Sequence, residues 1–221
     1  MAMFAPLVDW ITIQRAELSE DSAVVFTVRL DASDRPALRA HFLALSAEDR
    51  RLRFGFIAND AAIERYVDGI DFSRDTVFGV NVETRNFEGI AHLALDKKHA
   101  ELGLSVLDPY RGRGIGTALV SRAAVHARNR DIDVLFMQCL SENRAIMRIA
   151  ASIGMRVVTQ GPDSEASMSL PSANPPGIVR ELMDGGIALC DAALRETLLR
   201  HAAAGPVTQS KGLAGKHRAT A

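Results

Sequence analysis

The chain has little cysteine, little net charge and no long hydrophobic run. Its two cysteines, Cys139 and Cys190, lie far apart in the sequence, which is typical of a reducing compartment rather than of a disulfide scaffold. We therefore expect a cytoplasmic protein. The net charge of −1 gives no indication of binding to nucleic acid or to an anionic membrane surface.

No segment approaches the roughly 18 consecutive uncharged apolar residues that a membrane-spanning helix requires. Residues 1–8 are apolar but carry no basic leader and no cleavage site, so we do not expect an export signal. The six histidines and two cysteines show no metal-ligand spacing, and we expect no bound metal. What the chain does have is enough apolar residues, 48% of 221, to form one substantial core.

Hydrophobic periodicity divides the chain into one domain, at residues 1–170, and an appendage. A Pro-rich linker is predicted at 171–177, an amphipathic helix at 178–204 and a disordered tail at 205–221. Within the domain the patterns predict strands at 10–14, 23–30, 76–83, 88–96, 100–107, 134–140, 155–159 and 168–170. They predict two short helices, starting near residues 33 and 46, and longer ones at 117–130 and 143–153, with hairpin turns at 84–86 and 161–163.

The most informative segment is Arg111-Gly112-Arg113-Gly114-Ile115-Gly116, which lies between a predicted strand and a predicted helix. Its glycines leave backbone N–H groups uncovered, and the start of a helix adds partial positive charge, so the segment is expected to bind a phosphate or pyrophosphate. A dinucleotide fingerprint would need a glycine at Thr117, and a Walker loop would need a lysine, which the sequence lacks from Glu101 to Arg156.

This segment resembles the coenzyme A loop of the GNAT superfamily of acyl-CoA-dependent N-acetyltransferases, whose signature is Gln/Arg-x-x-Gly-x-Gly/Ala. The resemblance extends over about residues 11–170 through the order of predicted strands and helices. It implies an α/β fold with a mixed, mostly antiparallel central sheet flanked by helices, here followed by a C-terminal helical extension. It also implies acetyl-CoA as the acyl donor.

The resemblance assigns residues to that donor. The strand before the loop is expected to splay from its neighbour at a bulge, so that its backbone pairs with the pantetheine arm and the Val106 N–H polarises the thioester carbonyl. The amides from Gly112 to Thr117 are expected to hold the pyrophosphate, and Asn143 matches an asparagine that touches the cofactor. The residues expected at the cofactor are thus Leu104, Ser105, Val106, Arg111, Gly112, Arg113, Gly114, Ile115, Gly116, Thr117 and Asn143.

Two positions depart from the family pattern. Many members carry a tyrosine, which protonates the leaving thiolate, where this chain has Ala150. Many carry a glutamate base where this chain has Gln138. Cofactor binding depends on neither residue, but the general acid is left unassigned.

Glu101 is the best candidate for the catalytic base, because it begins the strand that leads into the loop, where other family members place a glutamate base, and partial burial would raise its pKa. A strand-end carboxylate in solvent or in an ion pair is an equally weighted interpretation. His92 is the next candidate base, although a hydrogen-bonded core histidine is favoured there. His126 is expected to be a solvated helix residue.

Other reactive side chains are given structural interpretations. Cys139 has apolar neighbours, so core packing is favoured over a nucleophile. Ser105 lacks a G-x-S-x-G elbow. For at least one of Arg111 and Arg113 we favour contact with the cofactor phosphates. The alternative is that both lie in a solvated turn. The arginines at 50, 51 and 53 suit either an acidic acceptor or the wet face of a helix.

The function that follows is transfer of an acetyl group from acetyl-CoA to a primary amine, directly and without a covalent enzyme intermediate. The acceptor can be a protein lysine, a polyamine, an amino acid or an antibiotic amine, and the oligomeric state is open. A non-catalytic acyl-CoA-binding module, which Ala150 and Gln138 favour, is the alternative. A nucleotide-binding function is a weaker third.

Overall fold

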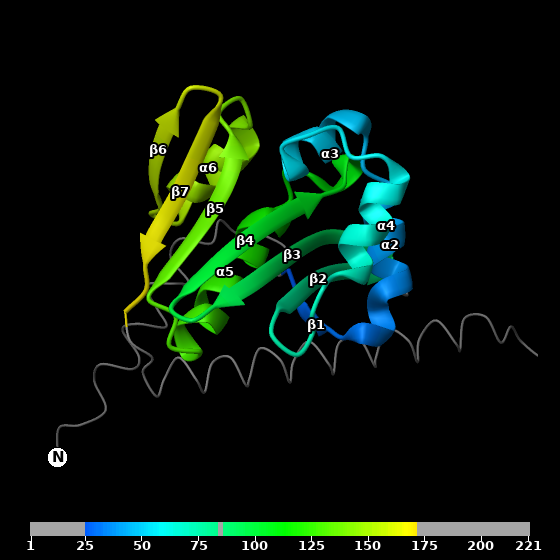
Figure 1. The fold of residues 1–221 in the computed structure, drawn as a ribbon, viewed down its shortest axis with the longest axis horizontal. Helices are drawn as coiled ribbons and strands as arrows, with labels where there is room; N and C mark the ends of the chain where they lie inside the picture. The colour runs from blue at the N-terminus through cyan, green and yellow to red at the C-terminus, as the bar shows by residue number, and fades with distance from the viewer. Residues whose placement is uncertain (1–24, 84–85, 172–221) are drawn as a thin grey trace, which may run out of the picture.

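The computed structural model describes residues 25–83 and 86–171. The predicted strand at 10–14, nearly all of the linker, the helix at 178–204 and the tail at 205–221 lie outside the described residues. The described strands form one sheet in the order β1-β2-β3-β4-β5-β7-β6, and every neighbouring pair is antiparallel except β4 and β5 (Figure 1). The strands are β1 Val28–Leu30, β2 Thr76–Glu83, β3 Asn86–Asp96, β4 His99–Val106, β5 Val134–Leu140, β6 Arg156–Gln160 and β7 Asp163–Ser169.

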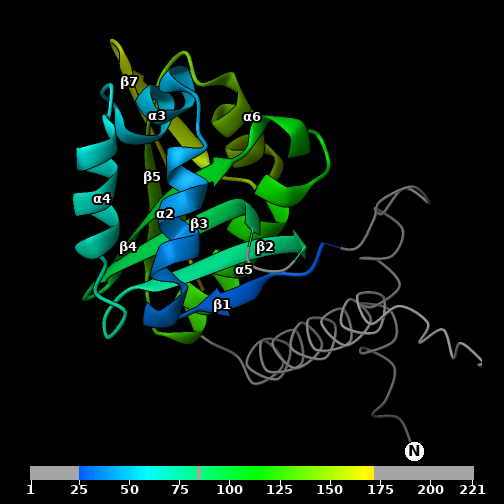
Figure 2. The same cartoon turned by 90° about the vertical axis from the view of Figure 1, so that its right-hand side faces the viewer.

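Helices cover both faces of this sheet. On one face α2 and α4 lie against β1, β2 and β3, and on the other α5 packs against β2, β3 and β4, with α6 against β6 (Figure 2). Helix α3 lies near the end of β4, above the gap between β4 and β5 (Figure 1). The helices are η1 Ala32–Asp34, α2 Arg35–Leu43, α3 Ala47–Phe54, α4 Asp60–Asp68, η2 Asp108–Tyr110, α5 Ile115–Asn129 and α6 Arg144–Ser152.

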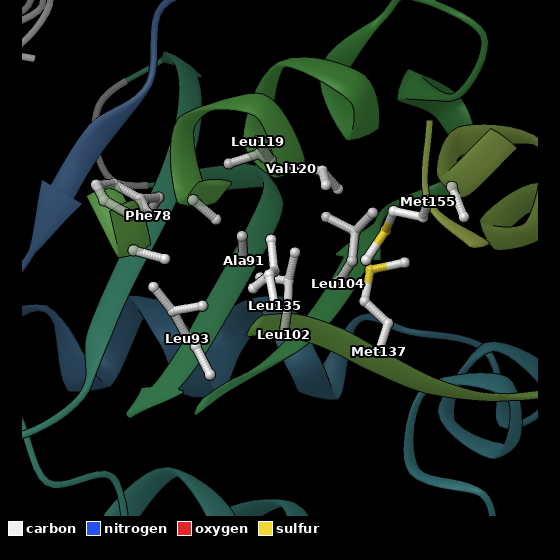
Figure 3. Close-up of a cluster of buried hydrophobic side chains, with 14 of the residues drawn as sticks. Phe78, Ala91, Leu93, Leu102, Leu104, Leu119, Val120, Leu135, Met137 and Met155 are labelled. Carbon is white, nitrogen blue, oxygen red and sulfur yellow. The ribbon is translucent and has the colours of Figure 1, made fainter. Parts of the chain in front are cut away.

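The hydrophobic core is double because successive residues of a strand face opposite sides of the sheet. On β3, Ile90 faces the α2 and α4 side, whereas Ala91 and Leu93 face α5. Figure 3 shows the larger of the two clusters, in which Leu119 and Val120 of α5 face the side chains of the sheet, among them Ala91 of β3 and Leu102 of β4. The sheet is therefore held on both faces, and the parts of β4 and β5 that diverge are anchored by these cores.

The mixed, mostly antiparallel sheet flanked by helices is confirmed, and so are both predicted hairpins, with residues 84–85 undescribed in the first. The prediction of two helices between the first strands and the hairpin is wrong, because α4 is a third. The side chain of Asn59 caps α4, while Ile63 and Val67 are buried at helical spacing, so the missed signal was in the sequence.

Candidate active site

The candidate site is the wedge that opens between β4 and β5. These two strands pair only from His99 to Glu101 and from Val134 to Phe136, and then diverge (Figure 1). Two cavities open into the wedge, of about 590 Å³ and about 490 Å³. Both are lined by the same four residues where they meet: Leu52, Arg53, Leu104 and Ile146.

The smaller cavity, here called the loop cavity, ends at the glycine-rich loop. Gly112 and Gly114 have φ of +75° and +78°, and nothing lies within 4 Å of where a Cβ would stand at either. No side chain caps α5 at Gly114, and the amides of residues 112–117 donate no hydrogen bond to another described residue. Since α5 runs for 15 residues, its N-terminus presents bare donors and a positive dipole end to this cavity.

One side of this cavity is the backbone of β4. Leu104, Ser105 and Val106 pair with β3, but their other edge faces no described strand, because the pairing with β5 has already ended. A peptide-like arm can therefore pair with that edge. The expected bulge is not found in β4, whose register against β3 is unbroken from Val106 to His99. Divergence of β5 produces the splay without one.

The arginines of the loop are held by protein groups. Arg111 forms ion pairs with Asp49 and Asp108, and Arg113 donates to the Pro109 carbonyl oxygen at 3.1 Å. Exposed Arg148 on α6, which sequence reasoning missed, also lines this cavity and forms no ion pair with a described carboxylate. Its position on the exposed side of a short amphipathic helix gave no signal.

Asn143 lines the loop cavity and also shapes it. Its Oδ1 accepts from the Ile146 N–H at 3.2 Å and so caps α6, while its Nδ2 lies 3.5 Å from the Leu52 carbonyl oxygen. The asparagine thus ties α6 to α3 across the opening.

The larger cavity, here called the acidic cavity, lies on the other side of the junction. Its carboxylates are Glu101 on β4 and Asp163 and Glu165 on β7, and Gln138 on β5 also lines it. All four side chains are exposed, so the partial burial expected for Glu101 is wrong. Glu101 still pairs with Phe136, but the cavity that opens beyond this pair leaves its side chain in contact with solvent.

The absence of a hydroxyl at Ala150 is structural as well as chemical. Ala150 lies on the inner face of α6 and is completely buried in the core. Cys139 is half-buried, with its Sγ near Met147 Sδ, and burial raises the pKa of its thiol. This agrees with packing rather than with a nucleophilic role.

His92 belongs to a buried chain of hydrogen bonds. Arg53 Nη2 donates to the Tyr66 hydroxyl at 2.8 Å, and the Tyr66 hydroxyl lies 2.7 Å from His92 Nδ1. His92 Nε2 lies 3.3 Å from Asp75 Oδ2, and Arg74 is paired with the same carboxylate. Burial, together with the charge of Arg53, lowers the pKa of His92. The hydrogen-bonded core histidine is therefore the interpretation that the structure favours.

The directions of these bonds are consistent with a neutral imidazole. His92 Nε2–H donates to Asp75, which leaves Nδ1 to accept from the Tyr66 hydroxyl, whose oxygen accepts from Arg53. Burial raises the pKa of Tyr66 against the opposing charge of Arg53. Tyr66 lies on α4, the helix that the sequence patterns missed, so this chain was not foreseen.

Two further histidines are buried, and one of them differs from expectation. His126 was expected to be solvated, but it is buried, with Nε2 3.1 Å from Thr76 Oγ1, because its face of α5 packs on β2. His41 on α2 lies 2.8 Å from the Ser105 hydroxyl on the far side of β4. Ser105 therefore has its side chain directed into the core, and only its backbone faces the wedge.

The three clustered arginines of α3 have separate roles. Arg50 pairs with Asp60 and donates to the main-chain carbonyl of Leu43, so it closes the α3–α4 corner. Arg51 pairs with Glu48 and Glu142 at the surface. Arg53 alone of the three lines both cavities, and it forms no ion pair with a described carboxylate.

Comparison with known proteins agrees with this geometry. The family model described as Acetyltransferase (GNAT) domain matches residues 26–156, which is more than half of the chain. No curated protein sequence matches the chain. No described helix is long and apolar enough to cross a membrane, and no three metal-ligating side chains gather among residues 25–83 and 86–171.

Solved structures share the fold at low sequence identity. The GNAT domain of S. lividans PAT is 18% identical, with a TM-score of 0.57 over 65% of this chain and 89% of that one. The ribosomal-protein-S18-alanine N-acetyltransferase from Escherichia coli is 16% identical, with a TM-score of 0.52 over 69% and 97%. The yncA protein of Salmonella typhimurium, solved with acetyl-CoA, is 16% identical, with a TM-score of 0.52 over 70% and 98%.

Proposed function

The chain belongs to the GNAT acetyltransferase family, and on that premise we propose that it transfers an acetyl group from acetyl-CoA directly to a primary amine. The observation that carries the proposal is the meeting of two chemically different cavities in the wedge between β4 and β5. One offers bare amides for an anionic carrier. The other offers carboxylates for a cationic amine.

The loop cavity suits coenzyme A. Amides 112–117 at the start of α5 would hold the pyrophosphate, and the free edge of β4 from Leu104 to Val106 would pair with the pantetheine arm. Arg148 would add charge for a phosphate, and Asn143 would keep α6 in place beside the arm. Acetyl-CoA supplies an activated thioester, so the protein needs only to orient it and manage protons and charge.

The acidic cavity suits the acceptor. Three carboxylates concentrate a protonated amine there, and the amine must lose a proton before it can attack. Glu101 lies at the point where the strands begin to diverge, close to the junction of the cavities, and is the base we assign. Because Glu101 is exposed, proton transfer through a water is within its reach.

Replacement of Glu101 tests the assignment. Glu101→Gln is expected to lower kcat by about 100-fold, the usual contribution of a general base, and to leave the dissociation constant for acetyl-CoA nearly unchanged. The matched control is Glu64→Gln, an exposed glutamate on α4 that lines neither cavity. Thiol release with a panel of amines, in parallel with calorimetric titration of acetyl-CoA, gives both quantities.

The panel also separates a second candidate function. Completely buried Ala150, which provides no hydroxyl, favours a module that binds acyl-CoA without catalysis. Such a module would bind acetyl-CoA tightly and release no thiol with any lysine peptide, polyamine, amino acid or aminoglycoside. If Glu101→Gln instead turns over at an unchanged rate, the proposed acetyl transfer stands, but Glu101 is not its base.

A further inference from the structure

The junction of the two cavities contains one charged side chain. Of the four residues that line both, Leu52, Leu104 and Ile146 are apolar, and the fourth is Arg53. If the donor occupies the loop cavity and the acceptor the acidic cavity, as in the proposed function on which this inference rests, the acetyl group changes partners at this junction. Arg53 is therefore beside the reacting atoms.

The guanidinium of Arg53 is fixed in place. Nη2 donates to the Tyr66 hydroxyl at 2.8 Å, and the guanidinium carbon lies 4.9 Å from the centre of the Phe54 ring and 5.5 Å from that of Tyr66. The group also rests on the backbone of β4 at Gly103, where a Cβ would stand 2.0 Å from Nη2. Only glycine leaves room for it there, and His92 in turn orients Tyr66.

The charge of this group is not neutralised by a described residue. Arg53 forms no ion pair with a carboxylate in the described part of the chain, and its Nε is buried without a hydrogen-bond partner there. A buried donor without a partner is costly to folding. A preorganised cation with spare donors is what a reaction that develops negative charge requires.

We propose that Arg53 is a catalytic residue that stabilises the negative charge of acetyl transfer, first on the carbonyl oxygen and then on the departing sulfur. The amine nitrogen forms a bond to the carbonyl carbon, and the π electron pair moves to oxygen. That pair returns as the C–S bond breaks, and the bonding electrons leave on sulfur as a thiolate. The proton of the amine passes to Glu101 through water, and the thiolate takes a proton from solvent.

This role accounts for the missing hydroxyl at Ala150. A thiol has a pKa near 8.5, so a thiolate beside a cation is a good leaving group without a proton donor. The alternative partner for Arg53 is a carboxylate on the acceptor. The charge of the acidic cavity argues against this alternative, since Glu101, Asp163 and Glu165 would repel an anionic acceptor.

Binding of free coenzyme A tests the proposal without turnover. If Arg53 faces the sulfur, the bound thiol has a lowered pKa, so the affinity of coenzyme A relative to acetyl-CoA rises as the pH increases from 6.5 to 9. A lowering by one pKa unit gives a rise in that ratio that approaches about tenfold once the pH is well above the pKa of the free thiol. Acetyl-CoA is the matched ligand, because it contacts the same residues and has no ionisable thiol.

Variants assign this pH dependence to Arg53. In Arg53→Gln the rise in the affinity ratio is expected to disappear and kcat to fall by about 100-fold or more, with little change in acceptor KM. Arg53→Lys keeps the charge and part of both effects. Gly103→Ala keeps the arginine but displaces its guanidinium, and should reproduce the loss. Arg51→Gln, on the same helix but in neither cavity, should match the unmodified protein.

Other outcomes overturn the inference. If Arg53→Gln raises the acceptor KM and leaves kcat unchanged, Arg53 binds the acceptor and is not catalytic. If the affinity of coenzyme A relative to acetyl-CoA still rises with pH in Arg53→Gln, Arg53 does not face the sulfur. If Arg53→Gln does not fold, the affinity ratio and kcat of Arg53→Lys and Gly103→Ala test the proposal in its place. Absence of coenzyme A binding and thiol release in the unmodified protein would instead refute the proposed function itself.

Discussion

His41 is a buried titratable residue that supports β4 from behind. It has little exposed surface, and its Nδ1 lies 2.7 Å from the Phe87 carbonyl oxygen, an acceptor, so Nδ1 carries the proton. Nε2 then accepts from the Ser105 hydroxyl at 2.8 Å. Burial lowers the pKa of His41 to about 4, against a raising effect of the Phe87 hydrogen bond.

This shift makes stability depend on pH in a defined direction. The unfolded chain binds a proton at His41 near pH 6.5 and the folded one only near pH 4, so the contribution is fully present above pH 6.5 and is lost as the pH falls toward 4. The loss is about 3 kcal/mol. Urea unfolding should show a free energy that falls by about this amount more in the unmodified protein than in His41→Gln. If the free energies of unfolding of the two proteins fall equally as the pH decreases, the predicted contribution of His41 is contradicted.

Individual residues also show where sequence reasoning stops. Glycines at 112 and 114 were correctly identified from the sequence as open backbone positions, because their conformational freedom is a local property. Arg53 looked like its neighbours Arg50 and Arg51, and only tertiary packing gave each a different partner. Glu101 is exposed because a cavity opens where β4 and β5 separate, and no local pattern encodes where two strands separate.

Among the secondary-structure elements, α5 and the loop before it place the strictest requirement on backbone conformation. Gly114 stands at the N-cap with a φ of +78°, where an L side chain is strained although the surrounding space is open. Gly161, in the turn between β6 and β7, has a φ of +63° and equally open surroundings. The two glycines impose the same local requirement at different distances from the loop cavity.

Alanine at each position separates strain from cofactor binding. Gly114→Ala and Gly161→Ala are both expected to lose about 1 kcal/mol of stability. Only Gly114→Ala should also weaken acetyl-CoA binding, by about tenfold, since it turns the amides away from the pyrophosphate. Thermal melts and calorimetry of both variants measure the two effects. Equal acetyl-CoA affinities in the two variants would mean that the loop amides do not bind the carrier.

Most elements follow directly from local sequence. The mostly apolar strand Val134–Leu140 and the periodic helix α5 appear where predicted, because each buries the apolar side chains that its pattern places on one side. Helix α4 also has a local signal, a capping Asn59 followed by Ile63 and Val67 at helical spacing, which the reading of the sequence overlooked. Two strands were predicted less well: β1 is only Val28–Leu30 instead of 23–30, and β7 is Asp163–Ser169 instead of 168–170. Boundaries elsewhere shift by one or two residues, as helix ends commonly do.

The whole molecule is a sheet whose two halves part at the site. The order of elements predicted the family and the class of sheet, whereas the divergence of β4 from β5 is a tertiary feature. Helices α2, α4 and α5 pack on the half that contains β1 to β4, and α6 packs on β6 in the other half. Each half of the sheet is packed against its own helices, so the wedge between β4 and β5 is open although both hydrophobic clusters are well packed. A ligand that spans the wedge contacts both halves at once.

The most direct test of this account is calorimetric titration of the full chain with acetyl-CoA, with ATP and NAD titrated in parallel. We expect one saturable site per chain, with a dissociation constant on the order of micromolar, and no comparable binding of either nucleotide. Absence of acetyl-CoA binding at millimolar concentration, or equal binding of all three ligands, would contradict it.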